Sequence, residues 1–236
     1  SIEKEFSAGH FEAEVLKVLE KEFKNRDVVL LSGGSGLYVN ALCEGLSEFP
    51  EVDSDLRERL VDDYSSKGIT YLQRQIGHYD PAYAETADFE NPQRLMRALE
   101  VSMMTGKPYS EFRTGASIAR KFSTIYIGLE LPRDILYDRI NQRVHRMIDA
   151  GLFDEARRVL EFRDINALKT IGYKEVFGHL DGEYDYEEAV RLLKRNTRRF
   201  SKRQMTWFKK NPDVRWFDPA DLDQIKSYLE NELSIS

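Results

Sequence analysis

Residues 28–46 read VVLLSGGSGLYVNALCEGL. The run VVLL is apolar and rich in β-branched residues, which predicts a short buried strand. The glycines at 33–36 predict a tight turn, and LYVNALCEGL after them predicts a helix. A strand, a glycine turn and a helix in this order form half of a parallel βαβ unit, so the stretch predicts an α/β fold.

The glycine turn has a second possible role besides chain reversal. Backbone N–H groups where such a turn opens a helix can bind an anion. SGGSGLY matches neither the dinucleotide fingerprint nor a Walker A loop, because no Lys-Ser or Lys-Thr pair follows the glycines. A turn without a ligand and an anion-binding turn therefore both remain open at this point.

Two further strands are predicted nearer the C-terminus. STIYIGLEL at 123–131 reads as a buried strand ended by Pro132, and VRWF at 214–217 as a last strand. Between them, residues 134–151 predict a helix ended by Gly151. Three strands are fewer than the four or more that are usual in an α/β domain of this size. The chain also begins without Met. We therefore expect a piece of a larger protein whose leading strands are missing.

Residues 49–116 differ in character from the sequence on either side. They predict three amphipathic helices, around 53–65, 69–77 and 92–105, and no strand. We expect an all-helical domain inserted into the α/β core. The core would then comprise residues 1–48 and residues 117–236, the second part carrying a basic C-terminal helix.

Composition limits the classes of protein to which the chain could belong. The 236 residues are 41% hydrophobic, with no run near the ~20 apolar residues that a spanning helix needs and no signal peptide. A single cysteine, Cys43, excludes an internal disulfide and a cysteine metal cluster, and the four histidines show no metal-ligand spacing. We expect a cytoplasmic protein without a membrane partner.

Positive charge is concentrated near the C-terminus of an otherwise acidic chain. Residues 191–210 carry nine Lys or Arg and no Asp or Glu, whereas the formal net charge of the chain is −6. The run predicts a helix whose inner stripe contains Val190, Leu193, Phe200, Trp207 and Phe208. A solvated helix face is the ordinary explanation of a charge run. The single sign of the charge favours a polyanion as partner, RNA before DNA.

Two other arginine groups have the same two interpretations. Arg139, Arg143 and Arg146 are four and three residues apart, so they share one face of the helix predicted at 134–151. Arg94 and Arg97 share a face of the helix at 92–105. Each group is either a solvated ridge or a set of phosphate contacts.

Several segments together resemble one family, the tRNA dimethylallyltransferases, also called tRNA isopentenyltransferases. The resemblance runs from Phe6 to Asp218, with Ser35 where the family usually has Thr. It implies a P-loop-type parallel-sheet core with a helical insertion. The segments that carry it are GGSGLY, NPQRLMRALEV, TGKPYSEF, RINQRV, ALKTIGYKE and TRRFSKRQMTWF.

The resemblance also implies a reaction and a site. Such enzymes transfer a dimethylallyl group from dimethylallyl diphosphate to the N6 amine of the adenine 3′-adjacent to the tRNA anticodon. Arg143 matches the arginine that stabilises the departing diphosphate, and Gly33, Gly34, Ser35 and Gly36 match the diphosphate loop. The residues expected to grip the anticodon arm are Gln93, Arg94, Arg97, Thr197, Arg198, Arg199, Lys202, Arg203 and Gln204.

The family's first motifs are not present in this chain. These are a P-loop with a Lys-Thr pair and an Asp-Ser motif whose Asp is taken as the base for the target amine. The resemblance implies Mg²⁺ as cofactor, with ligands in the segment expected before Ser1, and a monomeric enzyme. A Walker A motif in the upstream coding sequence would support this expectation.

Two alternative functions remain open at this stage. One is an isopentenyltransferase that acts on free adenine nucleotides. The basic helix and the helical insertion weigh against it, since a free nucleotide needs neither. The other is a catalytically incomplete module that binds RNA.

Overall fold

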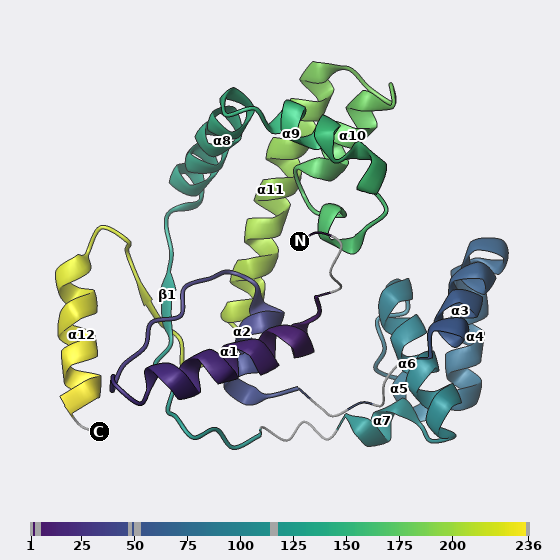
Figure 1. Cartoon of the computed structure of the whole chain (residues 1–236), viewed down its shortest axis with the longest axis horizontal. Coiled ribbons are helices and arrows are strands. Elements are labelled where there is room, and N and C mark those ends of the chain that lie inside the picture. The colour runs from purple at the N-terminus through teal and green to yellow at the C-terminus, as the bar shows by residue number, and fades with distance from the viewer. Residues whose placement is uncertain (1, 3–5, 47–48, 50–52, 114–117, 235–236) are drawn as a thin grey trace. The chain divides into compact units, whose positions relative to one another are not determined.

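The computed structural model describes residues 2, 6–46, 49, 53–113 and 118–234 (Figure 1). The chain divides into two compact units. Ser1–Cys43 and Arg120–Ser236 form one, which we call the discontinuous unit, and Glu44–Ala119 form the other, the helical unit.

The helical unit contains five helices in its described part. The three long ones correspond to the helices predicted from the sequence, and that prediction is confirmed. Asp53 and Asn91 cap two of them, because each side chain accepts a hydrogen bond from a backbone N–H of the first turn. The helices are α3 (Ser54–Lys67), α4 (Ile69–Tyr79), α5 (Pro81–Ala84), α6 (Pro92–Thr105) and α7 (Tyr109–Phe112).

The core of the helical unit lies between α3, α4 and α6. Its leucine and isoleucine side chains are almost fully buried, and they include Leu60, Leu72, Ile76, Leu95 and Leu99. A buried carboxylate, Asp80, holds the surrounding segments. Asp80 accepts hydrogen bonds from the backbone N–H of Tyr83 and from the N–H and hydroxyl of Ser110, which joins α5 to α7.

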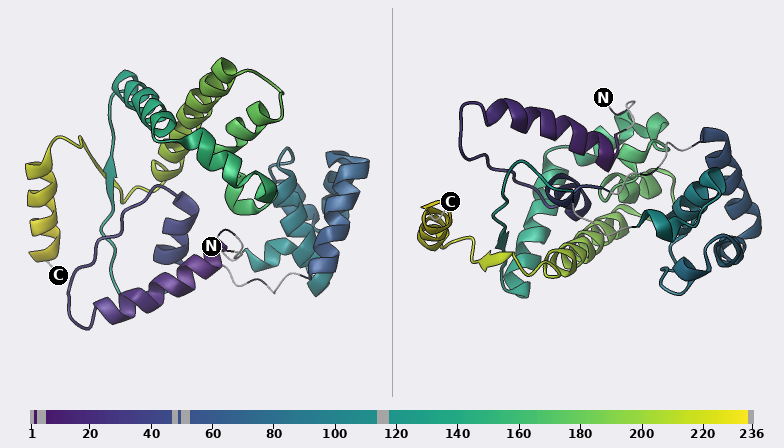
Figure 2. Two further views of the ribbon diagram at one scale, coloured as in Figure 1. Left: turned by 45° about the horizontal axis from the view of Figure 1, so that its top comes forward. Right: turned by 90° about the horizontal axis from the view of Figure 1, so that it is seen from below.

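The discontinuous unit contains most of the helices and both described strands. Its helices are α1 (Ala8–Glu22), α2 (Gly36–Glu44), α8 (Arg133–Asp149), α9 (Leu152–Arg158), α10 (Tyr173–Leu180), α11 (Tyr186–Phe208) and α12 (Leu222–Ser234), with 3₁₀ turns at Leu160–Phe162 and Asn166–Leu168. Figures 1 and 2 show α8, α9 and α10 beside the first half of α11. They share a core that includes Val144, Leu152, Val176, Phe177 and Leu193.

The two strands, β1 (Ile127–Leu129) and β2 (Arg215–Phe217), form a parallel pair. Ile127 lies opposite Arg215 and Leu129 opposite Phe217. The predicted strand at 123–131 therefore exists but is only three residues long. The strand at 214–217 begins one residue later than predicted.

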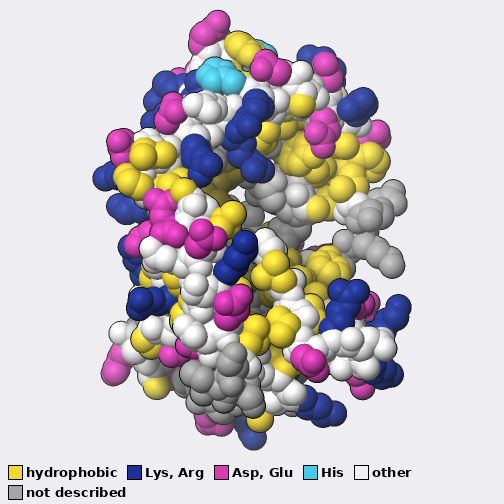
Figure 3. Space-filling model, turned by 90° about the vertical axis from the view of Figure 1, so that its left-hand side faces the viewer, with side chains coloured by type: hydrophobic (Ala, Val, Ile, Leu, Met, Phe, Trp, Pro, Cys, Tyr) yellow, Lys and Arg dark blue, Asp and Glu magenta, His cyan; other side chains and the backbone are white. Residues whose placement is uncertain are grey.

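The strand predicted at VVLL is wrong for this structure. Residues 28–31 have no regular secondary structure, and Leu30 is 88% exposed. A strand is stable only when a neighbour pairs its backbone groups, and among the described residues no segment pairs with this one. Hydrophobic side chains also reach the surface, between charges of both signs, on the face shown in Figure 3.

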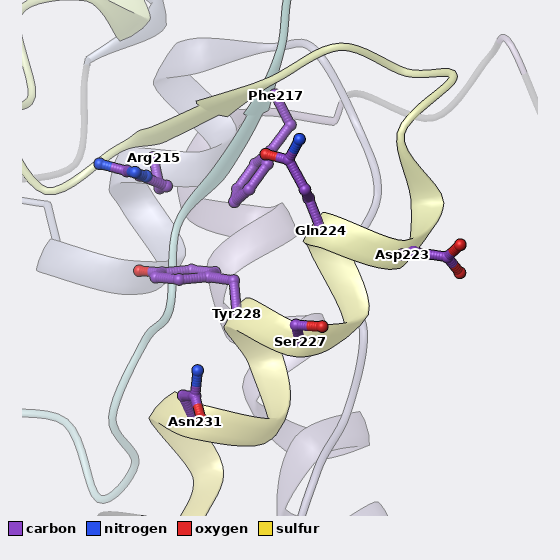
Figure 4. Close-up of a pocket in the computed structure, with 7 residues that line it drawn as sticks. All are labelled: Arg215, Phe217, Asp223, Gln224, Ser227, Tyr228 and Asn231. Carbon is purple, nitrogen blue, oxygen red and sulfur yellow. The ribbon is translucent and has the colours of Figure 1, made fainter.

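The C-terminal helix α12 was not predicted from the sequence. It lies beside β2, where an open groove of about 390 Å³ is lined by residues of both elements (Figure 4). The Phe217 and Tyr228 rings meet there with centroids 5.4 Å apart. The groove contains none of the predicted site residues.

Candidate functional site

The basic helix α11 is 23 residues long and starts at an acidic cap. The Asp185 side chain accepts a hydrogen bond from the N–H of Glu188, and Glu187 and Glu188 occupy the first turn, where the helix dipole favours negative charge. Arg191 donates two hydrogen bonds to the Glu188 carboxylate, which lowers the pKa of Glu188. Arg191 is thus already paired, so the unpaired positive charge begins further along the helix.

The first half of α11 is packed and the second half is largely open. Ala189 and Leu193 are buried against neighbouring helices. Phe200 and Trp207, which were expected on the inner stripe, are 42% and 39% exposed. The stripe prediction is therefore wrong for Phe200 and Trp207, whereas Phe208 is half-buried.

Three predicted tRNA contacts on α11 are free at its surface. Arg199, Lys202 and Arg203 are exposed. Within the part of the chain that the structure describes, none of the three forms an ion pair, although the Arg203 guanidinium lies 5.7 Å from the Phe200 ring centroid. These side chains can reach a phosphate without breaking an internal contact.

Three other predicted contacts are occupied inside the discontinuous unit. Arg198 donates to Asn141 Oδ1 at 2.6 Å and lies over the Tyr137 ring, which joins α11 to α8. The Thr197 hydroxyl donates to the carbonyl of Leu193. The third, Gln204, donates from Nε2 to the carbonyl oxygen of Gly34 at 2.7 Å.

The glycine turn packs against the end of α11. A Cβ atom on Gly36 would lie 2.3 Å from Cδ1 of Trp207, a distance that only glycine avoids. The Trp207 indole also donates to Asn40 Oδ1 at 3.2 Å. The Ser35 carbonyl accepts the first hydrogen bonds of α2, from the N–H groups of Tyr38 and Val39. The turn predicted to hold diphosphate is thus fixed by α11, with Gly33 and Ser35 exposed.

Arg143 is exposed on α8, next to the buried Val144. Arg139 and Arg146 are also exposed, while Ile140 and Val144 face the interior, so the three arginines lie on the solvent side of one helix, in agreement with the prediction that they share a face. Arg143 makes no hydrogen bond or ion pair with any described residue. Its guanidinium is therefore available to an anion.

In the helical unit, the predicted contacts lie along α6. Gln93 and Arg94 are exposed, and Arg94 Nη1 is 3.7 Å from an Asp88 carboxylate oxygen. The half-buried Arg97 lies 3.4 Å from the buried Glu100 carboxylate and over the Phe49 ring. Arg97 therefore has a structural partner, whereas Gln93 and Arg94 present most of their polar atoms to solvent.

The described residues do not form a metal site. They contain no group of three or more His, Cys, Asp or Glu side chains that could hold a metal ion. No helix among them is both long enough and apolar enough to span a bilayer.

A family model described as IPP transferase matches residues 1–211 of the chain. The chain belongs to the IPP transferase family. The resemblance drawn from the sequence motifs is confirmed, and with it the α/β fold class with a helical insertion.

Individual relatives of the IPP transferase chain agree with this assignment. A protein of Cytophaga hutchinsonii named tRNA dimethylallyltransferase is 48% identical over 99% of this chain and 77% of its own length. A protein of Bacteroides fragilis named tRNA dimethylallyltransferase 1 is 45% identical, over 95% of this chain and 75% of its own length. The crystal structure of a tRNA isopentenylpyrophosphate transferase from Bacillus halodurans superposes with a TM-score of 0.66 at 34% identity, covering 99% of this chain and 76% of that one.

Sequence reasoning missed the neutral partners of the site. Asn141 and Tyr137 contact the predicted Arg198, and Asn40 contacts Trp207 at the end of α11, yet each is an ordinary polar or aromatic residue in its own segment. Only the structure brings together positions more than fifty residues apart.

The contact between Gly36 and Trp207 leads to a test of stability. Gly36→Ala should lower the free energy of unfolding by about 1–3 kcal/mol, because the new methyl group displaces a bulky ring from a packed site. Gly33→Ala is the matched control, since nothing lies within 4 Å of its Cβ position. Thermal denaturation of both variants measures the difference. Equal melting temperatures would contradict the packing of the turn on α11.

Proposed function

We propose that this protein transfers a dimethylallyl group from dimethylallyl diphosphate to the N6 amine of an adenine in tRNA. The observation that carries the proposal is its membership of the IPP transferase family, with relatives named tRNA dimethylallyltransferase along nearly the whole chain. These relatives are named for tRNA, which weighs against an enzyme of free adenine nucleotides. The adenine 3′-adjacent to the anticodon is the proposed target.

The reaction defines what the protein must do. The bond between the allylic carbon and the diphosphate oxygen breaks, a bond from the adenine N6 to that carbon forms, and the amine loses a proton. Negative charge develops on the leaving diphosphate, so fixed cations and N–H donors aimed at it lower the barrier. The adenine must also leave its stack to reach the carbon.

We assign the leaving diphosphate to Arg143 and to the glycine turn. Arg143 has an unpaired guanidinium, and the turn stands at the N-terminus of α2, where backbone N–H groups and the helix dipole favour an anion. Family enzymes are also expected to use magnesium. From this chain itself, Arg143 would supply a cation and the glycine turn backbone N–H groups.

We assign the grip on the tRNA anticodon arm to two surfaces. One is the open half of α11, where Arg199, Lys202 and Arg203 are free, and the other is α6 with Gln93, Arg94 and Arg97. Arg198, Thr197 and Gln204 support the first surface from within, since each already donates a hydrogen bond inside the discontinuous unit. A monomeric enzyme acting in the cytoplasm stays a prediction.

A transfer assay tests the function. The full-length protein that carries this chain, given dimethylallyl diphosphate, magnesium and unmodified tRNA, should produce N6-dimethylallyl adenosine in the RNA, detected by mass spectrometry of its nucleosides. AMP in place of tRNA should give no product. Prenylation of AMP but not of tRNA would overturn the proposal.

The role of Arg143 can be separated from RNA binding. In the full-length protein, Arg143→Ala should lower turnover about a hundredfold or more, while tRNA affinity changes little, because the contact strengthens as the diphosphate leaves. Arg146→Ala, on the same exposed side of α8, is the matched control. Normal turnover by the Arg143 variant would contradict the assignment.

The contribution of α11 to RNA binding can be measured from the salt dependence of the affinity. Replacing both Arg199 and Lys202 by Ala should lower the slope of log affinity against log salt by about two for an anticodon stem-loop, roughly one per lost phosphate contact. Arg198 is left unchanged because its loss also breaks the contact with Asn141. The control replaces Lys24 and Lys226, two exposed lysines outside α11, and alters net charge equally. Equal slopes for the two double variants would mean that Arg199 and Lys202 are solvated side chains that make no contact with the RNA phosphates.

A further inference from the structure

Glu175 is a buried carboxylate that the proposed reaction does not use. It lies in the motif ALKTIGYKE, at the start of α10, and is 3% exposed. Among the described residues it has no cationic partner within ion-pair distance. Burying a carboxylate costs free energy unless hydrogen bonds replace its water, so its donors define its role.

Each carboxylate oxygen of Glu175 accepts one hydrogen bond from a neutral donor. Oε2 accepts from the backbone N–H of Gly172 at 2.8 Å, within the turn that begins α10. Oε1 accepts from Nδ2 of Asn196 at 2.7 Å, in the middle of α11. The carboxylate therefore joins the turn before α10 to α11.

Both ends of this bridge are geometrically restricted. Gly172 has a φ of 112°, a conformation that residues with a side chain rarely adopt, so the turn that directs its N–H at Glu175 requires glycine at this position. Asn196 lies between Arg195 and Thr197, three residues before Arg199. On a helix, a shift at one residue moves its neighbours together, so the position of Asn196 sets where the cations of α11 stand.

We propose that Glu175 is a positioning residue for the RNA-binding surface of α11. Through Asn196 it fixes the rotation of α11 and its position along the helix axis. It thereby sets the places at which Arg199, Lys202 and Arg203 contact the tRNA backbone. It contacts neither substrate nor reacting atoms. The inference rests on the proposed function.

The test replaces one hydrogen-bond acceptor of Glu175 by a donor in the full-length protein. Glu175→Gln brings an amide NH₂ against either the Gly172 N–H or the Asn196 NH₂. Turning the Asn196 amide by 180° would avoid this clash, but it would point that NH₂ at the Arg195 Nε–H, from which Asn196 Oδ1 accepts at 3.4 Å. One donor is therefore left facing another donor in either arrangement. The Kd for an anticodon stem-loop should rise about tenfold, while the KM for dimethylallyl diphosphate stays unchanged. Adding Asn196→Asp supplies an acceptor for the new amide and should return the Kd to within about threefold of wild type.

Tyr184→Phe is the matched control. The Tyr184 hydroxyl donates to the backbone carbonyl of Glu175 at 3.0 Å, so the variant loses a hydrogen bond at the same residue but keeps the bridge to α11. It should lower the melting temperature without changing the Kd. If Glu175→Gln does not fold, Asn196→Ala breaks the bridge from the other helix and must raise the Kd similarly.

The possible outcomes separate the two proposals. No binding of the stem-loop by wild type would overturn the proposed function itself. Binding by wild type with an unchanged Kd in Glu175→Gln, no recovery in the double variant, or an equal loss in Tyr184→Phe would overturn the positioning role and leave the function standing.

Discussion

The discontinuous unit depends on how one long, strongly cationic helix is held in place. Helix α11 buries only Ala189 and Leu193 fully, because its remaining faces carry charge. Two fully buried side chains are few for a helix of 23 residues, even with the partly buried Val190 beside them, so directional bonds also fix its rotation and its position along the axis. Those bonds come from polar groups of neighbouring segments: Asn141 to Arg198, Glu175 to Asn196, and Gly34 to Gln204. None of these groups pairs with Arg199, Lys202 or Arg203, so the bonds hold the helix without cancelling the charge on its open side.

The cationic side chains of α11 therefore fall into two groups, those that pack inside the unit and those that are exposed. The sequence alone does not distinguish the two groups. Arg198 and Arg199 are neighbours of the same type, yet one lies over the Tyr137 ring and the other is exposed. Successive residues on a helix point about 100° apart, so adjacent arginines necessarily face different surroundings. The proposed contact with the tRNA backbone needs cations that are exposed. The packing of α8 decides which cations of α11 are free to make it.

This division also explains how far the sequence could predict the structure. Periodic apolar residues placed α3, α4, α6, α8 and α11 near their observed bounds, because each helix buries a stripe against local neighbours. The strand expected at VVLL failed, since a strand depends on a partner that its own sequence does not specify. The motifs identified the family, and the site segments that they imply stay a prediction. They could not separate free from occupied side chains, because Gln204 and Gly34 are 170 positions apart.

The packing of Trp207 on Gly36 couples the residue types that are allowed at two positions far apart in the sequence. A larger side chain at 36 has room only if 207 becomes smaller, and a smaller residue at 207 leaves a void that a larger residue at 36 can fill. Relatives that depart from glycine at the first position should therefore depart from tryptophan at the second. In an alignment of relatives, the residues at these two positions should therefore covary.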